Sequence, residues 1–169
     1  MQLKLIAGLG NSEGRYTGTY HNIGARFVNF LQKYPPFASL AEKIALLPTS
    51  GFMNESGSWI LPAMTRLGAK PETTLLAHDD SDLTLGSYKL NHDRGAAGHN
   101  GVQSVFDGAH SNAFWRARIG IRSGTEKRQA LEFVLLPIPS EELAIFETVF
   151  KKLADEIINN LTAHEQYIG

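Results

Sequence analysis

The sequence predicts one α/β domain, a three-layer α/β/α sandwich with a central mixed, largely parallel twisted sheet. The chain has 169 residues, and a single hydrophobic core typically serves about 100–200 residues. Its residues are 43% hydrophobic and 20% charged, which is ordinary for a globular protein. Short apolar runs alternate with stretches of helical periodicity, which is typical of strands interleaved with helices. We therefore expect residues 1–169 to form a single domain with helices on both faces of the sheet.

The first two predicted elements are a buried strand and a helix. Leu3–Ala7 is a short apolar run that ends at Gly8, as a strand entering a turn does. The helix that follows is expected to stop at Pro35-Pro36, because proline lacks the backbone N–H that a helix interior needs. The apolar residues of this helix recur at helical spacing: Ile23, Phe27, Phe30, Leu31 and Tyr34.

A strand, a helix and a third strand are expected next. Ile44–Leu47 is the second apolar run, and Pro48 ends it. The helix has Gly68 as its C′ residue, and its apolar stripe comprises Ile60, Leu61, Met64 and Leu67. Thr73–Ala77 is apolar and partly β-branched, which predicts the third strand, and it runs into an acidic string, Asp79, Asp80 and Asp82.

Two strands and two helices are predicted in the second half of the chain. Leu85–Leu90 alternates as a strand does, and Gly95–Gly98 is a loop before a helix. Trp115–Ile121 alternates basic and apolar residues, which is typical of a half-exposed strand. Ser140 is the expected cap of the last helix. The first helix carries Val102, Val105 and Phe106, and the second carries Leu143, Phe146, Phe150, Leu153, Ile157 and Leu161.

Composition excludes several classes of protein. The chain has no cysteine, which excludes a disulfide scaffold, thiol catalysis and a cysteine-based zinc site. No apolar run approaches the about 18 residues of a membrane helix, and the first residues have no secretory signal pattern, so we expect no membrane association and a cytoplasmic location. The net charge is −1, yet residues 89–128 carry seven basic and three acidic residues and residues 141–169 carry two basic and six acidic residues. The basic middle and the acidic tail make a polarised molecule if the two segments occupy different faces of the fold, and are otherwise ordinary solvated surface.

Two local patterns have less specific readings. Gly8, Gly10 and Gly14 follow a predicted strand, but no acidic residue lies between Gly14 and Ala41 to bind the ribose of a dinucleotide. The string that begins at His78 resembles a metal cluster. However, alternate residues of a strand point to opposite sides, so we expect one buried carboxylate with solvated neighbours there and no metal site.

Polar residues at predicted loops and element ends make up a reaction site when they are combined. His21 supplies a base that titrates near neutral pH, and Asp79 supplies a carboxylate that can fix its tautomer. Three carboxamides can both donate and accept, and so can hold a carbonyl group or a water molecule: Asn11, Asn54 and Asn100. This inventory indicates activation of water for hydrolysis.

At these residues the sequence resembles bacterial-type peptidyl-tRNA hydrolases, over nearly the whole chain. The resemblance rests on motifs in the same order: Gly8-Leu9-Gly10-Asn11 with Tyr16, His21-Asn22-Ile23-Gly24, Phe52-Met53-Asn54, Ala77-His78-Asp79, Gly98-His99-Asn100-Gly101, and Arg116 to Ile121 followed by Phe133-Val134-Leu135. The chain departs from the family in Ser12-Glu13 after Asn11, in Tyr20 before His21, and in a short segment between Tyr34 and Pro48.

The resemblance implies hydrolysis of the ester between an N-blocked peptide and the 3′-terminal ribose of tRNA, which recycles peptidyl-tRNA from stalled translation. It implies that His21, Asp79 and Asn11 are catalytic and that no metal or cofactor takes part. Tyr16, Phe52, Met53, Asn54 and Asn100 would bind substrate. The substrate's acceptor stem and 3′ end would be the partner of a monomer, with Lys89, Arg94 and Arg116 as expected contacts to phosphate. Two alternatives stay open: a diverged, non-catalytic module that binds the tRNA acceptor end, and a hydrolase of another acyl ester.

Overall fold

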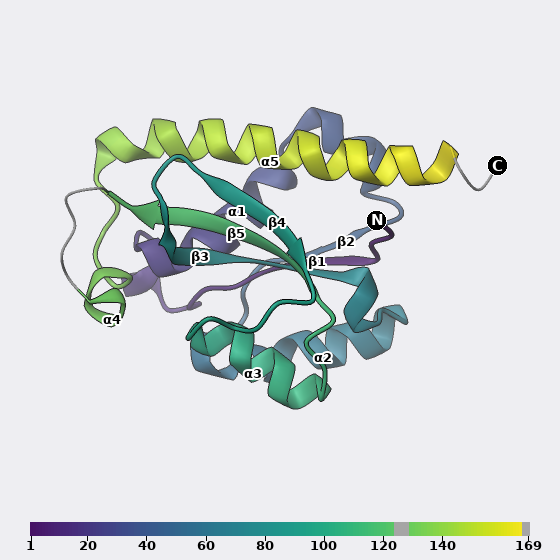
Figure 1. Cartoon of the computed structure of the whole chain (residues 1–169), viewed down its shortest axis with the longest axis horizontal. Coiled ribbons are helices and arrows are strands. Elements are labelled where there is room, and N and C mark those ends of the chain that lie inside the picture. Colours follow the sequence, from purple (N-terminus) through teal and green to yellow (C-terminus); the bar gives the residue numbers. More distant parts are fainter. Residues whose placement is uncertain (124–128, 167–169) are drawn as a thin grey trace.

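Five strands form one mixed sheet in the order β2-β1-β3-β5-β4 (Figure 1). The computed structural model describes residues 1–123 and 129–166. The strands β1 (Leu5–Gly8), β2 (Ala45–Leu47), β3 (Thr74–Thr84) and β5 (Trp115–Arg122) are parallel, and β4 (Tyr88–His92) pairs antiparallel with β5. This confirms the predicted mixed and largely parallel sheet.

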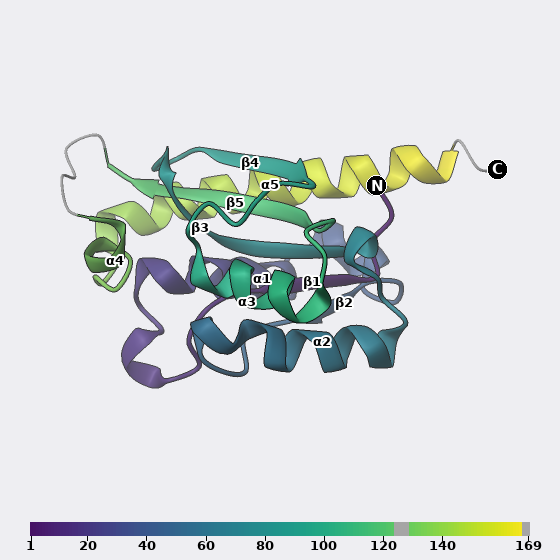
Figure 2. The same cartoon turned by 60° about the horizontal axis from the view of Figure 1, so that its bottom comes forward.

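Helices cover both faces of the sheet. Residues of α1 (Ile23–Leu31) and α5 (Ser140–Gln166) share one core. Residues of α2 (Ser56–Leu67) and α3 (Asn100–Ala109) share the other core, on the side of the sheet away from α5 (Figure 2). The short α4 (Ala130–Phe133) lies before α5 at one end of the molecule. As predicted, α2 ends at Gly68, which adopts the left-handed conformation with φ 58°. In the described parts of the chain, no helix is long and apolar enough to cross a membrane.

Alternation along β3 divides the interior into two cores. Leu75 and Ala77 pack into the core that α1 and α5 cover, and Leu76 packs into the core that α2 and α3 cover. Both cores are needed because a buried parallel strand is apolar on its two faces. Because the strands are apolar on both faces, helices must cover the sheet on both sides, which gives the three layers.

The third strand is longer than the sequence predicts. It continues to Thr84, so the acidic string lies within β3 and not after it. The extension is stable because β5 pairs alongside it as far as Asp80 and again at Thr84. On the other side β1 ends at Gly8, opposite Ala77. Residues from His78 onward therefore extend past the carboxyl end of β1, where ligands gather in open α/β sheets.

The predicted half-exposed character of β5 is wrong. Six of its eight residues are buried, among them Arg116 and Arg118. Both of its edges are paired, with β3 and β4, and both sheet faces are covered there. The neighbouring strand also begins later than expected, at Tyr88, because the turn at Gly86, with φ 87°, precedes it.

Candidate active site

A cleft lies beyond the carboxyl end of β1 and along β3. It consists of two adjoining cavities of about 270 and 410 Å³. Both cavities are lined by His21, Asn100, Leu131 and Val134, so they form one cleft with His21 at the junction. His78 and Asp79 line the smaller cavity.

His21 is positioned by the turn that leads into α1. It lies in the 3-10 turn η2 (Tyr20–Asn22), and its backbone N–H donates to the carbonyl of Val134 at 2.8 Å. At the start of α1, a Cβ on Gly24 would lie 2.1 Å from the carbonyl oxygen of Ala77. The missing side chain of Gly24 thus lets the helix start lie directly on β3, two residues before Asp79.

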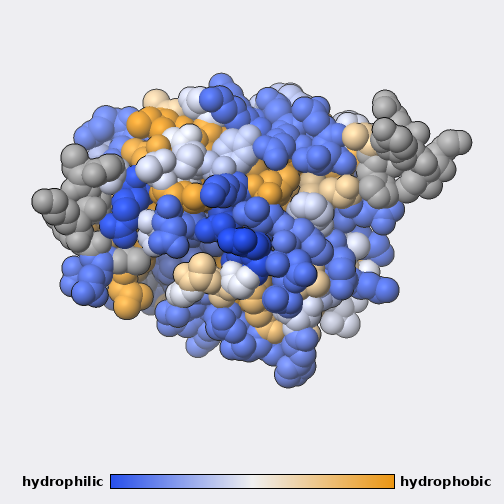
Figure 3. Space-filling model, viewed as in Figure 1, coloured by the Kyte–Doolittle hydropathy of each residue, from blue (hydrophilic) through white to orange (hydrophobic). Residues whose placement is uncertain are grey.

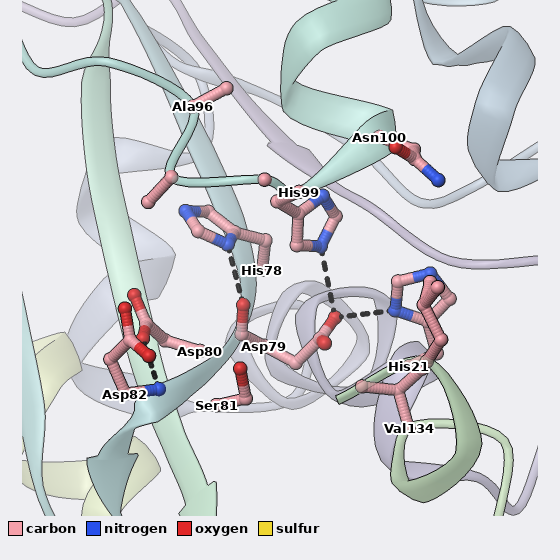
Figure 4. A pocket seen from close by; sticks show the side chains of 13 residues that line it. His21, His78, Asp79, Asp80, Ser81, Asp82, Ala96, His99, Asn100 and Val134 are labelled. Carbon is pink, nitrogen blue, oxygen red and sulfur yellow. Dashed lines mark hydrogen bonds and ion pairs between the residues drawn. The ribbon is translucent and has the colours of Figure 1, made fainter. Parts of the chain in front are cut away.

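His21 and Asp79, separated by 58 residues in the sequence, meet in this cleft. The distance from His21 Nδ1 to Asp79 Oδ1 is 2.9 Å (Figure 4). Because an ionised carboxylate only accepts hydrogen bonds, Nδ1 must carry the proton. The lone pair of neutral His21 is therefore on Nε2, which in Figure 4 lies on the ring side away from Asp79. This is the tautomer that a general base needs.

The electrostatics favour an ionised Asp79 and a basic His21. Burial by itself raises the pKa of Asp79, whose side chain is 3% exposed, but its electrostatic interactions and hydrogen bonds with the imidazoles of His21 and His99 hold that pKa well below its usual range. Burial lowers the pKa of His21, and the charge and hydrogen bond of Asp79 outweigh it, so the pKa of His21 is raised above 6.5.

A second imidazole binds the same carboxylate oxygen. His99 Nε2 lies 3.0 Å from Asp79 Oδ1, and His99 Nδ1 accepts the backbone N–H of Val102 at 3.2 Å as the N-cap of α3. The sequence prediction did not include His99 among the site residues. Its place in the motif next to Asn100 was the available signal.

Asn11 is held with its amide in one orientation. Its Oδ1 accepts the backbone N–H of Met53 at 2.8 Å, so the Asn11 NH₂ group is left to donate to a ligand. The backbone of Asn11 is fixed by two hydrogen bonds with the side chain of Asn22, at 2.8 and 2.9 Å. The predicted carboxamide is therefore preorganised as a hydrogen-bond donor.

The larger cavity collects the remaining predicted substrate residues. It is lined by Asn11, Tyr16, Phe52, Met53, Asn54 and Asn100, together with His21. Asn54 and Asn100 are exposed to solvent, whereas Met53 is buried. The fold thus brings all eight predicted catalytic and substrate residues to one cleft.

Comparisons with known proteins show to which family the chain is similar. The family described as Peptidyl-tRNA hydrolase matches residues 5–167. The chain belongs to the peptidyl-tRNA hydrolase family. A peptidyl-tRNA hydrolase of Coxiella burnetii is 35% identical, with 89% of this chain and 87% of that protein covered, and one of Ligilactobacillus salivarius is 32% identical, with 98% and 93% covered. The crystal structure of the Acinetobacter baumannii peptidyl-tRNA hydrolase is similar with a TM-score of 0.79 and 30% identity, covering 96% of this chain and 90% of that one.

Family membership makes the chain an ester hydrolase that cleaves peptidyl-tRNA. The cleft is compatible with hydrolysis that uses only side chains of the chain. In the described ranges, one group of residues offers metal-ligand atoms close together: His21, Asp79 and His99. Both imidazoles, however, donate to a single oxygen of Asp79, so hydrogen bonds account for the cluster and we assign no metal to it.

The predicted phosphate contacts of this peptidyl-tRNA hydrolase differ in exposure. Lys89 and Arg94 are exposed, and Figure 3 shows strongly hydrophilic side chains over the β4 region of this face. Arg116, by contrast, is 1% exposed, and this burial contradicts the expectation that it contacts phosphate. Two of the seven basic residues in the segment 89–128, Lys127 and Arg128, lie outside the described residues.

Burial of the two β5 arginines has different consequences. Arg118 Nε donates to Asp80 Oδ2 at 2.6 Å in a buried ion pair. Arg116 lies over the ring of Phe106, and its Nε and one terminal nitrogen have no hydrogen-bond partner. Burial, together with the charge of Arg118, lowers the pKa of Arg116 to about 10. These two residues therefore belong to the interior of the fold.

Proposed function

We propose that His21 is the general base of a peptidyl-tRNA esterase, and that Asp79 and Asn11 complete its catalytic group. The observation that carries this proposal is the 2.9 Å hydrogen bond between His21 and Asp79 inside the cleft. It fixes the proton on Nδ1 and leaves Nε2 to accept a proton from water. The raised pKa of His21 makes this nitrogen more basic than an ordinary imidazole.

The proposed reaction proceeds in two steps. Nε2 of His21 takes a proton from water as the oxygen attacks the carbonyl carbon of the ester, and the negative charge moves to the carbonyl oxygen. The bond from carbon to the ribose oxygen then breaks, and the His21 imidazolium returns the proton to that oxygen. The products are a peptide with a free carboxyl group and tRNA with a free terminal hydroxyl. Asp79 stabilises the imidazolium between the two steps.

The carboxamides orient the reactants. The NH₂ group of Asn11 is directed to donate to the ester carbonyl, because its Oδ1 is occupied by Met53. Asn54 and Asn100 line the same cavity and can hold the attacking water or the substrate. We assign Tyr16 and Phe52, together with Met53, to the walls that receive the substrate near its ester.

The tRNA body is proposed to bind the exposed basic residues Lys89 and Arg94, through phosphate groups of the acceptor stem. We propose that the protein acts as a monomer. We place the protein in the cytoplasm, where translation supplies peptidyl-tRNA and where its hydrolysis recycles tRNA from stalled synthesis.

The test is turnover of an N-blocked aminoacyl-tRNA by the wild type and by His21→Ala. We expect the variant to lose at least about 10²-fold in kcat, as removal of a general base does, with an unchanged circular dichroism spectrum. The matched control is His110→Asn, at the far end of α3, which should retain wild-type turnover. Turnover by His21→Ala within about threefold of the wild type would exclude His21 as the base. Equal hydrolysis of a simple aryl ester would favour a general acyl esterase.

A further inference from the structure

His99 links the catalytic carboxylate to the helix that carries Asn100. It is the N-cap of α3, and the first residue of that helix is Asn100. Its side chain is 8% exposed and lies between the start of α3 and β3, as Figure 4 shows. The imidazole of His99 therefore touches both a residue that orients the base and the helix end that lines both cavities.

The hydrogen bonds determine which nitrogen of His99 carries the proton. A backbone N–H can only donate, so Nδ1, which receives the N–H of Val102, must be unprotonated. The Asp79 carboxylate can only accept, so Nε2, at 3.0 Å from Oδ1, must be protonated. A doubly protonated ring would direct an N–H of Nδ1 at the N–H of Val102. The contacts thus specify a neutral ring with its proton on Nε2.

Asp79 Oδ1 accepts two N–H groups, one from His21 and one from His99. The charged or titratable groups that face His21 are Asp79 from β3 and His99 from the start of α3, with ring centroids of His21 and His99 5.1 Å apart. His99 is faced by these two groups and by His78, whose ring centroid is 4.7 Å away. Asp80 and Asp82 line the same cavity, but the carboxylate of Asp80 is paired with Arg118.

We propose that His99 is a positioning residue for the reaction: by donating from Nε2 to Asp79 it holds that carboxylate toward His21 and moderates how strongly Asp79 attracts the His21 proton. The proposal rests on the proposed function, since it requires His21 to be the base. The hydrogen bond from His99 stabilises the ionised carboxylate of Asp79 and lowers its affinity for a proton. His99 is also the N-cap of α3, so the same ring holds Asn100 in a fixed position relative to His21.

This role predicts a definite direction of change. Without the His99 N–H, the charge of Asp79 acts on His21 alone, and the protonated form of His21 becomes more stable. The acidic limb of the pH profile of kcat then moves to higher pH. A residue that merely capped α3 would leave this limb where it is.

The test separates the two roles with His99→Asn. Asparagine is among the best N-cap residues, so it replaces the bond to Val102, but its shorter side chain does not reach Asp79. We expect kcat on N-blocked aminoacyl-tRNA to fall by roughly 10-fold, less than the loss for the base itself, with KM changed by less than about twofold. The acidic limb is expected to rise by roughly half a pH unit. His99→Gln, which has the length to donate to Asp79, should restore the limb toward its wild-type position.

The control is His110→Asn, the same substitution at the other end of α3. His110 is the C-cap residue with φ 49°, a conformation that asparagine tolerates, so this variant should keep the wild-type kcat and pH profile. An unmoved limb in folded His99→Asn, or a limb that moves to lower pH, would overturn the proposal.

A measurement on the wild type needs no variant to fold. The imidazole ¹⁵N spectrum should show Nε2 of His99 protonated and Nδ1 bare, and the opposite tautomer would also overturn the proposal. Failure of the underlying function has a different signature, namely full activity of His21→Ala.

Discussion

Replacing Asp79 by asparagine removes one charge from the centre of the site while preserving its shape. The side chain of Asp79 is 3% exposed, and its Oδ1 receives N–H groups from His21 at 2.9 Å and from His99 at 3.0 Å. Because Val102 fixes the tautomer of His99, that ring continues to present an N–H. An asparagine at position 79 is therefore expected to direct its oxygen, and not its NH₂, toward both imidazoles. The position and the tautomer of His21 are then unchanged, so the variant isolates the effect of the negative charge of Asp79 on the reaction.

The size of the effect follows from the lost interaction. A hydrogen bond to a charged group contributes about 1.5–3 kcal/mol, and the bond between Asp79 and the His21 imidazolium has full strength only when His21 has taken the proton. Each 1.36 kcal/mol in the barrier is tenfold in rate, so kcat of Asp79→Asn is expected to fall by roughly 10- to 150-fold with KM nearly unchanged.

The pH profile provides an independent readout of the same variant. In the wild type, Asp79 raises the pKa of His21 above 6.5 against the effect of burial, so activity should increase with pH through a midpoint above that value. In Asp79→Asn the carboxylate charge is lost while burial, which lowers the pKa of His21, remains, so the acidic limb should move to lower pH than in the wild type.

The assay is kcat and KM on N-blocked aminoacyl-tRNA from about pH 5 to pH 9, across the range in which histidine titrates. Asp82→Asn is the matched control, because Asp82 is an exposed carboxylate that lines the same cavity and makes no contact with His21. Its kcat should stay within about threefold of the wild type. A comparable kcat in Asp79→Asn, or an acidic limb that does not move down, would refute the assignment of Asp79.

Three further predictions concern tRNA binding and the framework of the site. Lys89→Ala and Arg94→Ala should each reduce the slope of log tRNA affinity against log salt concentration by roughly 0.7–0.9. Arg116→Met, at a buried position, should leave this slope unchanged. A wild-type slope in both Lys89→Ala and Arg94→Ala would mean that other residues bind the phosphate groups. Asp80→Asn should lower the free energy of unfolding in urea by about 3–5 kcal/mol, because it leaves Arg118 buried without its carboxylate. Glu13→Gln, which removes the charge of the exposed pair with Arg15, should lower it by less than about 1 kcal/mol. Equal losses of stability in the two variants would contradict the argument from burial. Gly24→Ala should lower kcat by about 10²-fold, because a Cβ 2.1 Å from the carbonyl oxygen of Ala77 displaces the start of α1 and with it His21. Gly14→Ala is the control and should keep the wild-type kcat, because a Cβ at Gly14 would meet no atom within 4 Å.

The sequence alone was sufficient for the layer order and for the chemical groups of the site. Apolar runs of strand length and stripes of helical spacing are local properties, so the five strands and the main helices were found. Their ends were less accurate, and the largest error is at β3, which continues past Ala77 to Thr84. The types of residue in the site were also readable locally. An imidazole, a carboxylate and several carboxamides at element ends indicate hydrolysis wherever the chain brings them together.

The tertiary structure alone decided which of these groups meet and in which protonation form. His21 and Asp79 are far apart in the sequence, and they come into hydrogen-bond contact because the start of α1 packs closely on β3 at Gly24 and the backbone of His21 is bound to Val134. The tautomer of His99 depends on two partners from different elements, the carboxylate on β3 and a backbone N–H in α3. Such contacts are not encoded in local spacing, because they depend on how separate elements pack.

Burial was the other property that the sequence could not supply. The alternation of arginine with apolar residues in β5 is identical whether one face of the strand meets water or protein, and it suggested a half-exposed strand. In the fold, α3 and the residues that precede it cover that face, so Arg116 is enclosed against Phe106 and Arg118 is paired with Asp80. A strand's own sequence determines which side chains share a face, but whether that face reaches solvent is determined by segments elsewhere in the chain.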